Sequence, residues 1–160
     1  MKKLLLASTA AALVATGAYA GGHAKEVILG VQFGYTGPIE SLTGPMAAGA
    51  EMAMAEVTES GKLLDAATVT PIRADTGCID NGLATSNAER LIAEGINGLI
   101  GGDCSGVTGA ILQNVAIPNG MVMISPSATS PGLTTVEDNG LFFRTAPSDA
   151  REGQVMADVL

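Results

Sequence analysis

The chain has 160 residues and a formal net charge of −8, because 16 acidic residues outnumber 8 basic ones. An acidic chain with few aromatic residues and no basic patch argues against binding to nucleic acid or to an anionic membrane surface. Its 2 cysteines and 1 histidine form no cluster of the kind that holds a metal ion, and we expect no cofactor.

Residues 1–20 have the pattern of a secretory signal peptide. Two lysines precede an apolar stretch over 4–14 that is too short to span a bilayer, and Ala18-Tyr19-Ala20 fits the small-x-small pattern of a cleavage site. We expect cleavage after Ala20, a flexible leader over 21–25, and export to a bacterial periplasm. A membrane anchor is the weaker alternative.

A continuous apolar run over 27–31 predicts the first strand, buried on both faces. A loop rich in glycine and proline follows it over 34–45. Pro45 suits the first position of a helix, the apolar residues over 50–57 repeat at helical spacing, and Gly61 predicts the end of that helix.

The rest of the chain continues the alternation of strand and helix. Pro71 indicates that the second strand is an edge strand or carries a bulge. Asp80 or Asn81 can cap the second helix, and Gly95 ends it. The further expected elements are strands over 69–74, 96–100, 121–124 and 141–145, a helix over 107–115 that ends before Pro118, and a final helix over 149–160.

This alternation with short connections predicts an α/β fold: an open parallel sheet with helices on both faces. In such sheets, ligands bind beyond the carboxyl ends of the strands. Three loops are expected to meet there, over 34–45, 101–105 and 125–131.

The cysteines each follow a predicted strand. In an exported chain a cysteine pair favours a disulfide, and the ends of parallel strands can be neighbours. We therefore predict a Cys78–Cys104 bridge, which would stabilise the fold by about 3–4 kcal/mol in the chain-entropy model.

A rival interpretation concerns the same cysteine. Residues 102–106 read Gly-Asp-Cys-Ser-Gly, the thiol version of a hydrolase nucleophile elbow. Such an enzyme needs a histidine base, but the single histidine, His23, lies in the leader, so the base would have to lie beyond Leu160. A disulfide would also consume the thiol of Cys104. A Cys104-dependent hydrolase is kept as a distant alternative, and we expect no catalytic residue.

The segment over 96–109 is a short strand that breaks at Gly101-Gly102 and restarts as a helix at Cys104-Ser105. Backbone N–H groups at such a helix start can bind an anion. The loop over 125–131 adds hydroxyl groups between two prolines, which stiffen it. These features predict a carboxylate site of uncharged donors, with turns and caps as an equally simple explanation of the hydroxyls.

Other motifs are missing from the sequence. It has no Walker A lysine and no G-x-G-x-x-G after the first strand, which argues against nucleotide triphosphate and dinucleotide sites. The carboxylates of Asp75, Asp80 and Asp103 lie near loop ends, where helix capping and surface polarity explain them most simply.

Five blocks of sequence, in order and at consistent spacing, resemble the periplasmic binding proteins of the leucine/isoleucine/valine type, the receptors of branched-chain amino-acid ABC importers. The resemblance covers 27–160. The blocks are 34–38 (GYTGP), the turn over 75–80 that contains Cys78, 100–105 (IGGDCS), 124–129 (ISPSAT) with Leu133-Thr134 following, and 143–145 (FRT) with Ser148-Asp149.

The resemblance implies a type I periplasmic binding protein, in which two lobes close over a ligand about a hinge. Residues 26–146 would form the N-terminal ligand-binding lobe, and 147–160 the hinge crossing and first helix of the second lobe. The chain would be a monomeric receptor that delivers a small amino acid of branched-chain type, or a related amide or carboxylate, to a membrane permease. A ligand sensor of the same fold without transport is the alternative.

The resemblance also assigns roles to residues. Ser105 and Thr129 match the residues that bind the ligand carboxylate through hydroxyl and backbone N–H groups, and the Ser127 carbonyl matches an acceptor for the ammonium group of the ligand. Ala128 would lie against the ligand. At Leu42, well-known amino-acid binders carry an aromatic residue, and this departure leaves the identity of the ligand open. Cys78 and Cys104 match the bridge that the family has in this lobe.

Overall fold

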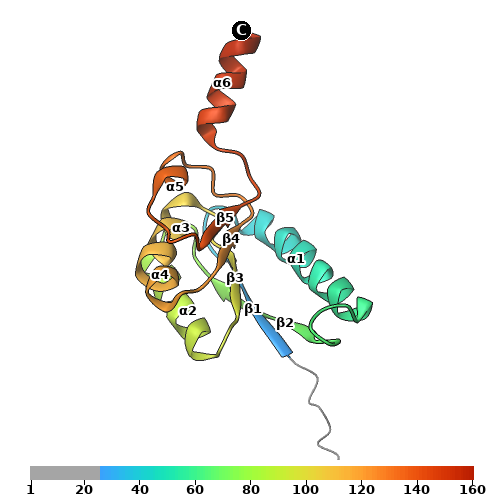
Figure 1. The fold of residues 1–160 in the computed structure, drawn as a ribbon. Coiled ribbons are helices and arrows are strands. Elements are labelled where there is room, and N and C mark those ends of the chain that lie inside the picture. The colour runs from blue at the N-terminus through green and yellow to red at the C-terminus, as the bar shows by residue number, and fades with distance from the viewer. Residues whose placement is uncertain (1–25) are drawn as a thin grey trace, which may run out of the picture.

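The computed structural model describes residues 26–160 (Figure 1). The predicted signal peptide, its cleavage after Ala20 and the leader over 21–25 lie outside the described residues. Within the described range, no helix has both the length and the apolar character needed to cross a bilayer.

Five parallel strands form one sheet in the order β2-β1-β3-β4-β5. The strands are β1 (Glu26–Phe33), β2 (Thr68–Asp75), β3 (Gly98–Gly101), β4 (Met123–Ser125) and β5 (Phe142–Arg144). The helical elements are α1 (Glu40–Ser60), α2 (Asn81–Ala93), α3 (Ser105–Ile111), the π-helical turn η1 (Leu112–Ala116), α4 (Ile117–Asn119), α5 (Gly132–Thr135) and α6 (Asp149–Val159).

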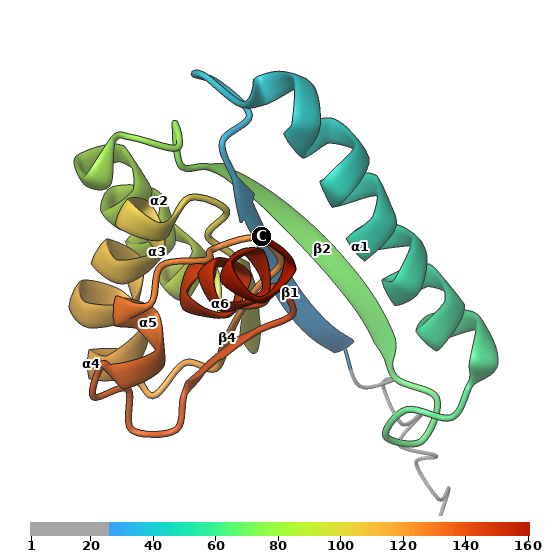
Figure 2. The same ribbon diagram turned by 90° about the horizontal axis from the view of Figure 1, so that it is seen from above.

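Helices lie on both faces of the sheet, which confirms the predicted architecture. Seen from above, α1 lies on one side of the sheet and α2, α3 and α4 lie on the other (Figure 2). Alternate residues of β1 face these two layers: Val31 and Phe33 pack in a cluster with α1, whereas Gln32 donates from Nε2 to the carbonyl of Ala84 in α2 at 2.7 Å.

The larger core lies on the α2 side. Leu91, Ile111, Leu112 and Met123 are fully buried there, from α2, α3, η1 and β4 respectively. Burial of apolar area of this kind contributes about 25 cal/mol per Å² and holds the strands that carry the site loops.

Several predicted boundaries are correct. Asp80 caps α2 by accepting a hydrogen bond from the Leu83 N–H at 2.9 Å, and Gly61 ends α1 with a left-handed φ of 61°. Pro71 lies in β2, which is an edge strand, as its proline indicated.

The positions of two prolines were predicted wrongly. Helix α1 begins at Glu40, so Pro45 lies inside it rather than at its first position. Pro118 lies within α4, and the run of helix that starts at Ser105 ends only at Gly120, in the left-handed conformation. The carbonyl that would bond to Pro45 in a regular helix belongs to the exposed Ser41, where water can satisfy it.

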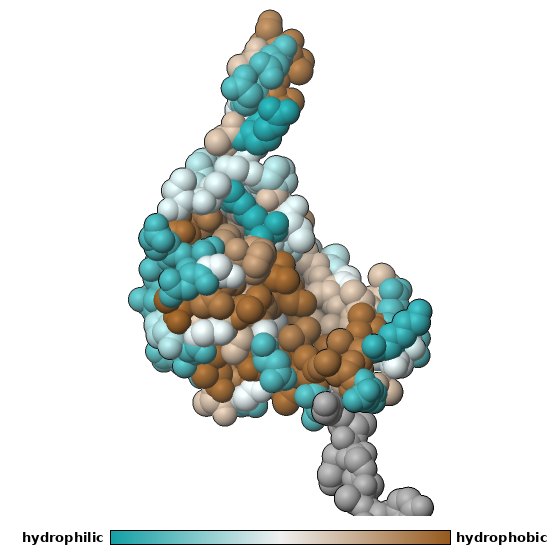
Figure 3. All heavy atoms as spheres, viewed as in Figure 1, coloured by the Kyte–Doolittle hydropathy of each residue, from teal (hydrophilic) through white to brown (hydrophobic). Residues whose placement is uncertain are grey.

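Part of the α1 face of the sheet is not covered by residues 26–160. Figure 3 shows a hydrophobic area on this side of the molecule. Ile124 is 40% exposed and Phe143 is 54% exposed there. Beside them, an apolar groove of about 260 Å³ lies between α1 and the sheet, lined by Val27, Leu29, Ala50, Ala53, Met54, Val57, Leu63, Val69 and Ile100.

Helix α6 projects away from the rest of the chain (Figure 1) and contains no buried residue. Ser148 caps it by accepting a hydrogen bond from the Ala150 N–H at 3.3 Å. Its apolar residues Val155, Met156 and Val159 are exposed.

Candidate functional site

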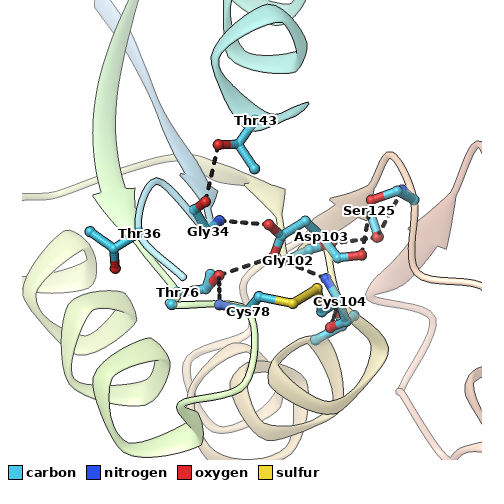
Figure 4. Close-up of a disulfide and its surroundings, with 12 residues drawn as sticks. Gly34, Thr36, Thr43, Thr76, Cys78, Gly102, Asp103, Cys104 and Ser125 are labelled. Atoms are coloured by element: carbon cyan, nitrogen blue, oxygen red, sulfur yellow. Dashed lines mark hydrogen bonds between the residues drawn. A yellow bond between two sulfur atoms is a disulfide. The ribbon is translucent and has the colours of Figure 1, made fainter. Parts of the chain in front are cut away.

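The loops that follow β2 and β3 are joined covalently at the carboxyl end of the sheet (Figure 4). The predicted Cys78–Cys104 disulfide is present, with an S–S distance of 2.06 Å. Because both cysteines of the chain are in this bond, Cys104 has no thiolate to act as a nucleophile. The structure therefore contradicts the Cys104-dependent hydrolase.

Two hydrogen bonds join the start of α3 to the loop that follows β4. Ser105 Oγ accepts from the Ser130 N–H at 3.1 Å, and Ser127 Oγ donates to the Asp103 carbonyl at 2.9 Å. The structure thus brings together two of the three loops that the sequence predicted to meet, those over 101–105 and 125–131. Because the first bond uses a lone pair of Ser105 Oγ, the hydroxyl hydrogen of Ser105 can still donate to a ligand.

Ser125, the last residue of β4, anchors the loop that follows this strand. Its hydroxyl donates to the Gly102 carbonyl at 2.5 Å and accepts from the Ala128 N–H at 3.0 Å. Ser125 is fully buried, so these bonds fix the loop against the end of β3. From the sequence, Ser125 was expected only as one of several hydroxyl residues in a polar loop, without this structural role.

Arg144 in β5 holds the same loop from the side. Its Nη1 donates to the carbonyls of Ala128 and Ser130, at 3.2 and 2.9 Å. A guanidinium group is suited to this task because its donors lie in a rigid plane. Arg144 therefore orders the loop that carries Thr129.

Within the described chain, the polar groups of the loop that have no partner in the protein include three at Ser127 and Thr129. No hydrogen bond engages the Ser127 carbonyl, the Thr129 hydroxyl or the Thr129 N–H, although the Thr129 carbonyl accepts from the Asp149 N–H at 3.0 Å. The Ser105 hydroxyl, which can still donate, adds a further uncharged group on the loop that is hydrogen-bonded to this one.

The other two predicted site residues differ in exposure. Ala128 is fully buried and belongs to the core on the α2 side, whereas Leu42, in the first turn of α1, is 60% exposed. A ligand contact of Leu42 or Ala128 stays a prediction.

For Asp103, the sequence favoured helix capping or surface polarity as the simplest explanation, but the structure shows a different role. The residue is only 3% exposed. Its Oδ2 accepts from the Gly34 N–H at 2.6 Å, and its Oδ1 accepts from the Thr76 hydroxyl at 3.0 Å and from the Cys104 N–H at 2.9 Å. No sequence motif indicates this arrangement, because its partners lie far apart along the chain.

Asp75 holds the loop that follows β1. It accepts from the Thr36 hydroxyl at 2.5 Å, the Thr36 N–H at 3.2 Å and the Gly77 N–H at 2.9 Å. Burial of the carboxyl group opposes ionisation, but these hydrogen bonds outweigh it and lower the pKa of Asp75.

Tyr35 lies at the outer edge of this region. Its hydroxyl donates to the Val31 carbonyl at 3.2 Å, and the guanidinium carbon of Arg73 lies 5.4 Å from the centre of its ring. Burial raises the pKa of Tyr35 to about 12, although the charge of Arg73 acts in the opposite direction. The phenol is therefore neutral at physiological pH.

The apolar groove beside α1 is separate from these groups. Its lining includes Val27 and Leu29, toward the start of β1, and consists of apolar residues alone. The polar groups described above lie at the opposite ends of the strands. The candidate site for a polar ligand is therefore the cradle formed by the loops after β3 and β4.

Residues 26–160 match the family model described as periplasmic binding protein. The chain belongs to this family. Among curated relatives, it is 31% identical over 160 residues to "Leu/Ile/Val-binding protein homolog 3" of Brucella melitensis, which covers 99% of this chain and 41% of the relative. It is 29% identical over 156 residues to "Leu/Ile/Val-binding protein BraC3" of Rhizobium johnstonii, covering 96% of this chain and 41% of that protein.

Solved structures of periplasmic binding proteins have the same fold. An ABC transporter substrate-binding protein from Desulfitobacterium hafniense, in complex with Leu, has a TM-score of 0.71 at 28% identity. The match covers 84% of this chain and 38% of the Desulfitobacterium chain. LivJ from Streptococcus pneumoniae, in complex with isoleucine, has a TM-score of 0.70 at 26% identity. The match covers 78% of this chain and 35% of the LivJ chain. The chain spans about 41% of the length of the curated relatives it matches.

Proposed function

We propose that the full-length protein is the periplasmic substrate-binding receptor of an ABC importer. It would bind a small amino acid between two lobes and deliver it, as a monomer, to a membrane permease. No bond would be made or broken. The observation that carries the proposal is the rigid cradle of uncharged hydroxyl and carbonyl groups that joins Ser105 to the loop over 125–131.

In this proposal the cradle binds the two charged groups of a zwitterion. The hydroxyls of Ser105 and Thr129 donate to the carboxylate, and the Ser127 carbonyl accepts from the ammonium group. Because Ser125 and Arg144 already hold the loop, little ordering is needed when a ligand binds. Leu42 would lie beside the ligand side chain.

Residues 26–146 form lobe one, and 147–160 cross to lobe two. The absence of buried residues in α6 supports this division. Lobe two would supply the remaining ligand contacts, and closure about the hinge would be a population shift that the permease recognises.

The relatives named as Leu/Ile/Val-binding favour a branched-chain amino acid as the ligand. The complexes with Leu and isoleucine favour the same class. Leu42 is smaller than an aromatic residue and non-planar, so amides and other small carboxylates should be tested as ligands together with the branched-chain amino acids.

Titration calorimetry of the full-length protein, freed of bound ligand by unfolding and refolding, tests the site. We expect Ser105→Ala and Thr129→Ala each to weaken the binding of L-leucine by about 1–3 kcal/mol, because each leaves a desolvated carboxylate without a partner. Thr135→Ala is the control, since Thr135 is an exposed threonine of α5. Unchanged affinity in both site variants would refute the site, and failure of the unaltered protein to bind any amino acid, amide or carboxylate would refute the function.

A further inference from the structure

Asp103 is a buried carboxylate without a charged partner in the described part of the chain. The ion pairs among residues 26–160 are Arg73–Glu51 and Arg90–Glu94. The charge of Asp103 is instead matched by three hydrogen bonds to its carboxylate. Hydrogen bonds to a buried charged group are strong, and removing their acceptor leaves several donors unpaired.

The partners of Asp103 come from the segments that follow four strands. The carboxylate accepts from Gly34 after β1, Thr76 after β2 and Cys104 after β3, and the Asp103 carbonyl accepts from Ser127 after β4. Figure 4 shows the carboxylate between the first three segments. One residue therefore connects every strand end that borders the candidate site.

The segment after β1 is packed closely against this carboxylate. A Cβ at Gly34 would lie 3.0 Å from Asp103 Oδ2 and 3.1 Å from the Cys78 nitrogen. The Gly34 carbonyl in turn accepts from the Thr43 hydroxyl at 3.0 Å, and Thr43 follows Leu42 in α1. The position of α1 relative to the cradle thus depends on the same group.

We propose that Asp103 is the positioning residue of the ligand cradle: it sets the relative places of the loops that carry Leu42, Ser105 and Ser127, and the disulfide does not. This inference rests on the proposed function. The disulfide joins only the segments after β2 and β3, and in the chain-entropy account it acts mainly on the unfolded chain. Asp103 makes its bonds only in the folded chain and reaches all four segments.

Substitutions in the full-length protein distinguish the role of Asp103 from that of the disulfide. We expect Asp103→Asn to weaken L-leucine binding by about tenfold or more, because the amide NH2 group must face either the Gly34 N–H or the Thr76 hydroxyl and Cys104 N–H, and the charge of the acceptor is lost. Removing the bridge with the double substitution Cys78→Ser and Cys104→Ser should lower the Tm while changing affinity less than about threefold. The reverse pattern would overturn the proposal. Thr76→Val removes one partner and should act in the same direction as Asp103→Asn, though less strongly.

Hydrogen exchange of the ligand-free protein provides a readout that does not depend on the ligand. In Asp103→Asn or Thr76→Val, we expect faster exchange in peptides over 33–36, 76–79 and 103–106 together, with the core strands protected. The control is Val115→Ala, which opens the core in η1 and should not act selectively on these loops. Faster exchange across the whole lobe, or at 103–106 alone, would overturn the proposal. If the unaltered protein does not bind L-leucine, the proposed ligand is wrong, and exchange still decides the role of Asp103.

Discussion

Asp75 illustrates how a single carboxylate fixes a loop. Its hydrogen bonds from Thr36 and Gly77 hold the segment after β1 against the segment after β2. These donors favour the ionised form, so the pKa of Asp75 is lower in the folded protein than its usual value of 3.8.

This shift predicts a pH dependence of stability. A carboxyl group with a lowered pKa in the folded state stabilises that state fully above its unfolded pKa, and this contribution is lost as the pH falls through the folded pKa. We expect Asp75→Asn to reduce the unfolding free energy at about pH 7, and the difference from the unaltered protein to shrink toward about pH 3. Urea unfolding at several pH values measures this.

The control for Asp75→Asn is Asp65→Asn, at an exposed position in the loop before β2. Asn accepts the left-handed φ of 61° at this position. A loss of stability in Asp75→Asn that does not change with pH would mean that amide packing, not ionisation, accounts for the effect.

At the residue level, the sequence predicted what local spacing and composition determine. The contact between the loops that carry Ser105 and Ser127 was predicted because polar residues followed two expected strands, and the disulfide because each cysteine followed a strand. The roles of Asp103 and Ser125 were not found, because their partners lie up to 69 residues away along the chain. Nothing near a loop aspartate indicates whether it faces water or the ends of other strands.

Helix boundaries depend on local chemistry, and those set by side-chain caps were predictable. Asp80 and Gly61 act as expected at the ends of α2 and α1. The helix boundaries predicted from the two prolines were wrong for a physical reason. A proline near the end of a helix leaves only one carbonyl unpaired, and water can satisfy that carbonyl when it is exposed.

The cap of α2 gives a prediction for that element. We expect Asp80→Ala to reduce the unfolding free energy by about 1 kcal/mol, because the Leu83 N–H loses its acceptor. Asp80→Asn keeps a side-chain oxygen at the cap and should cost much less. Chemical denaturation of both variants measures the difference. Equal losses would assign the effect to the negative charge at the helix start instead of to the hydrogen bond.

At the scale of the molecule, two apolar surfaces lack cover from residues 26–160. One is the sheet face with Ile124 and Phe143, and the other is the exposed stripe of α6. The apolar run over 27–31 predicted a first strand buried on both faces, but in β1 residues 30–33 are buried and 27–29 are only half-buried. Helices were expected on both faces of the sheet, yet Ile124 in β4 and Phe143 in β5 are exposed. A hydrophobic sequence pattern indicates that a face is buried, but it does not identify the segment of a longer protein that packs against that face.

The division into lobes predicts where α6 packs in the full-length protein. If α6 is the first helix of lobe two, its apolar stripe should be buried there, because an exposed stripe of Val155, Met156 and Val159 gains from burial. We expect Val155→Asp to lower the Tm of the full-length protein by about 3 °C or more.

Ala157→Asp is the matched control, since it adds the same charge at an exposed position of α6 outside the apolar stripe. We expect it to change the Tm much less than Val155→Asp, as surface substitutions usually do. Differential scanning calorimetry with and without L-leucine adds a second criterion, because a ligand that binds between the lobes stabilises both of them. Equal Tm values for the two variants would mean that the stripe stays in solvent, and the assignment of 147–160 to lobe two would be wrong.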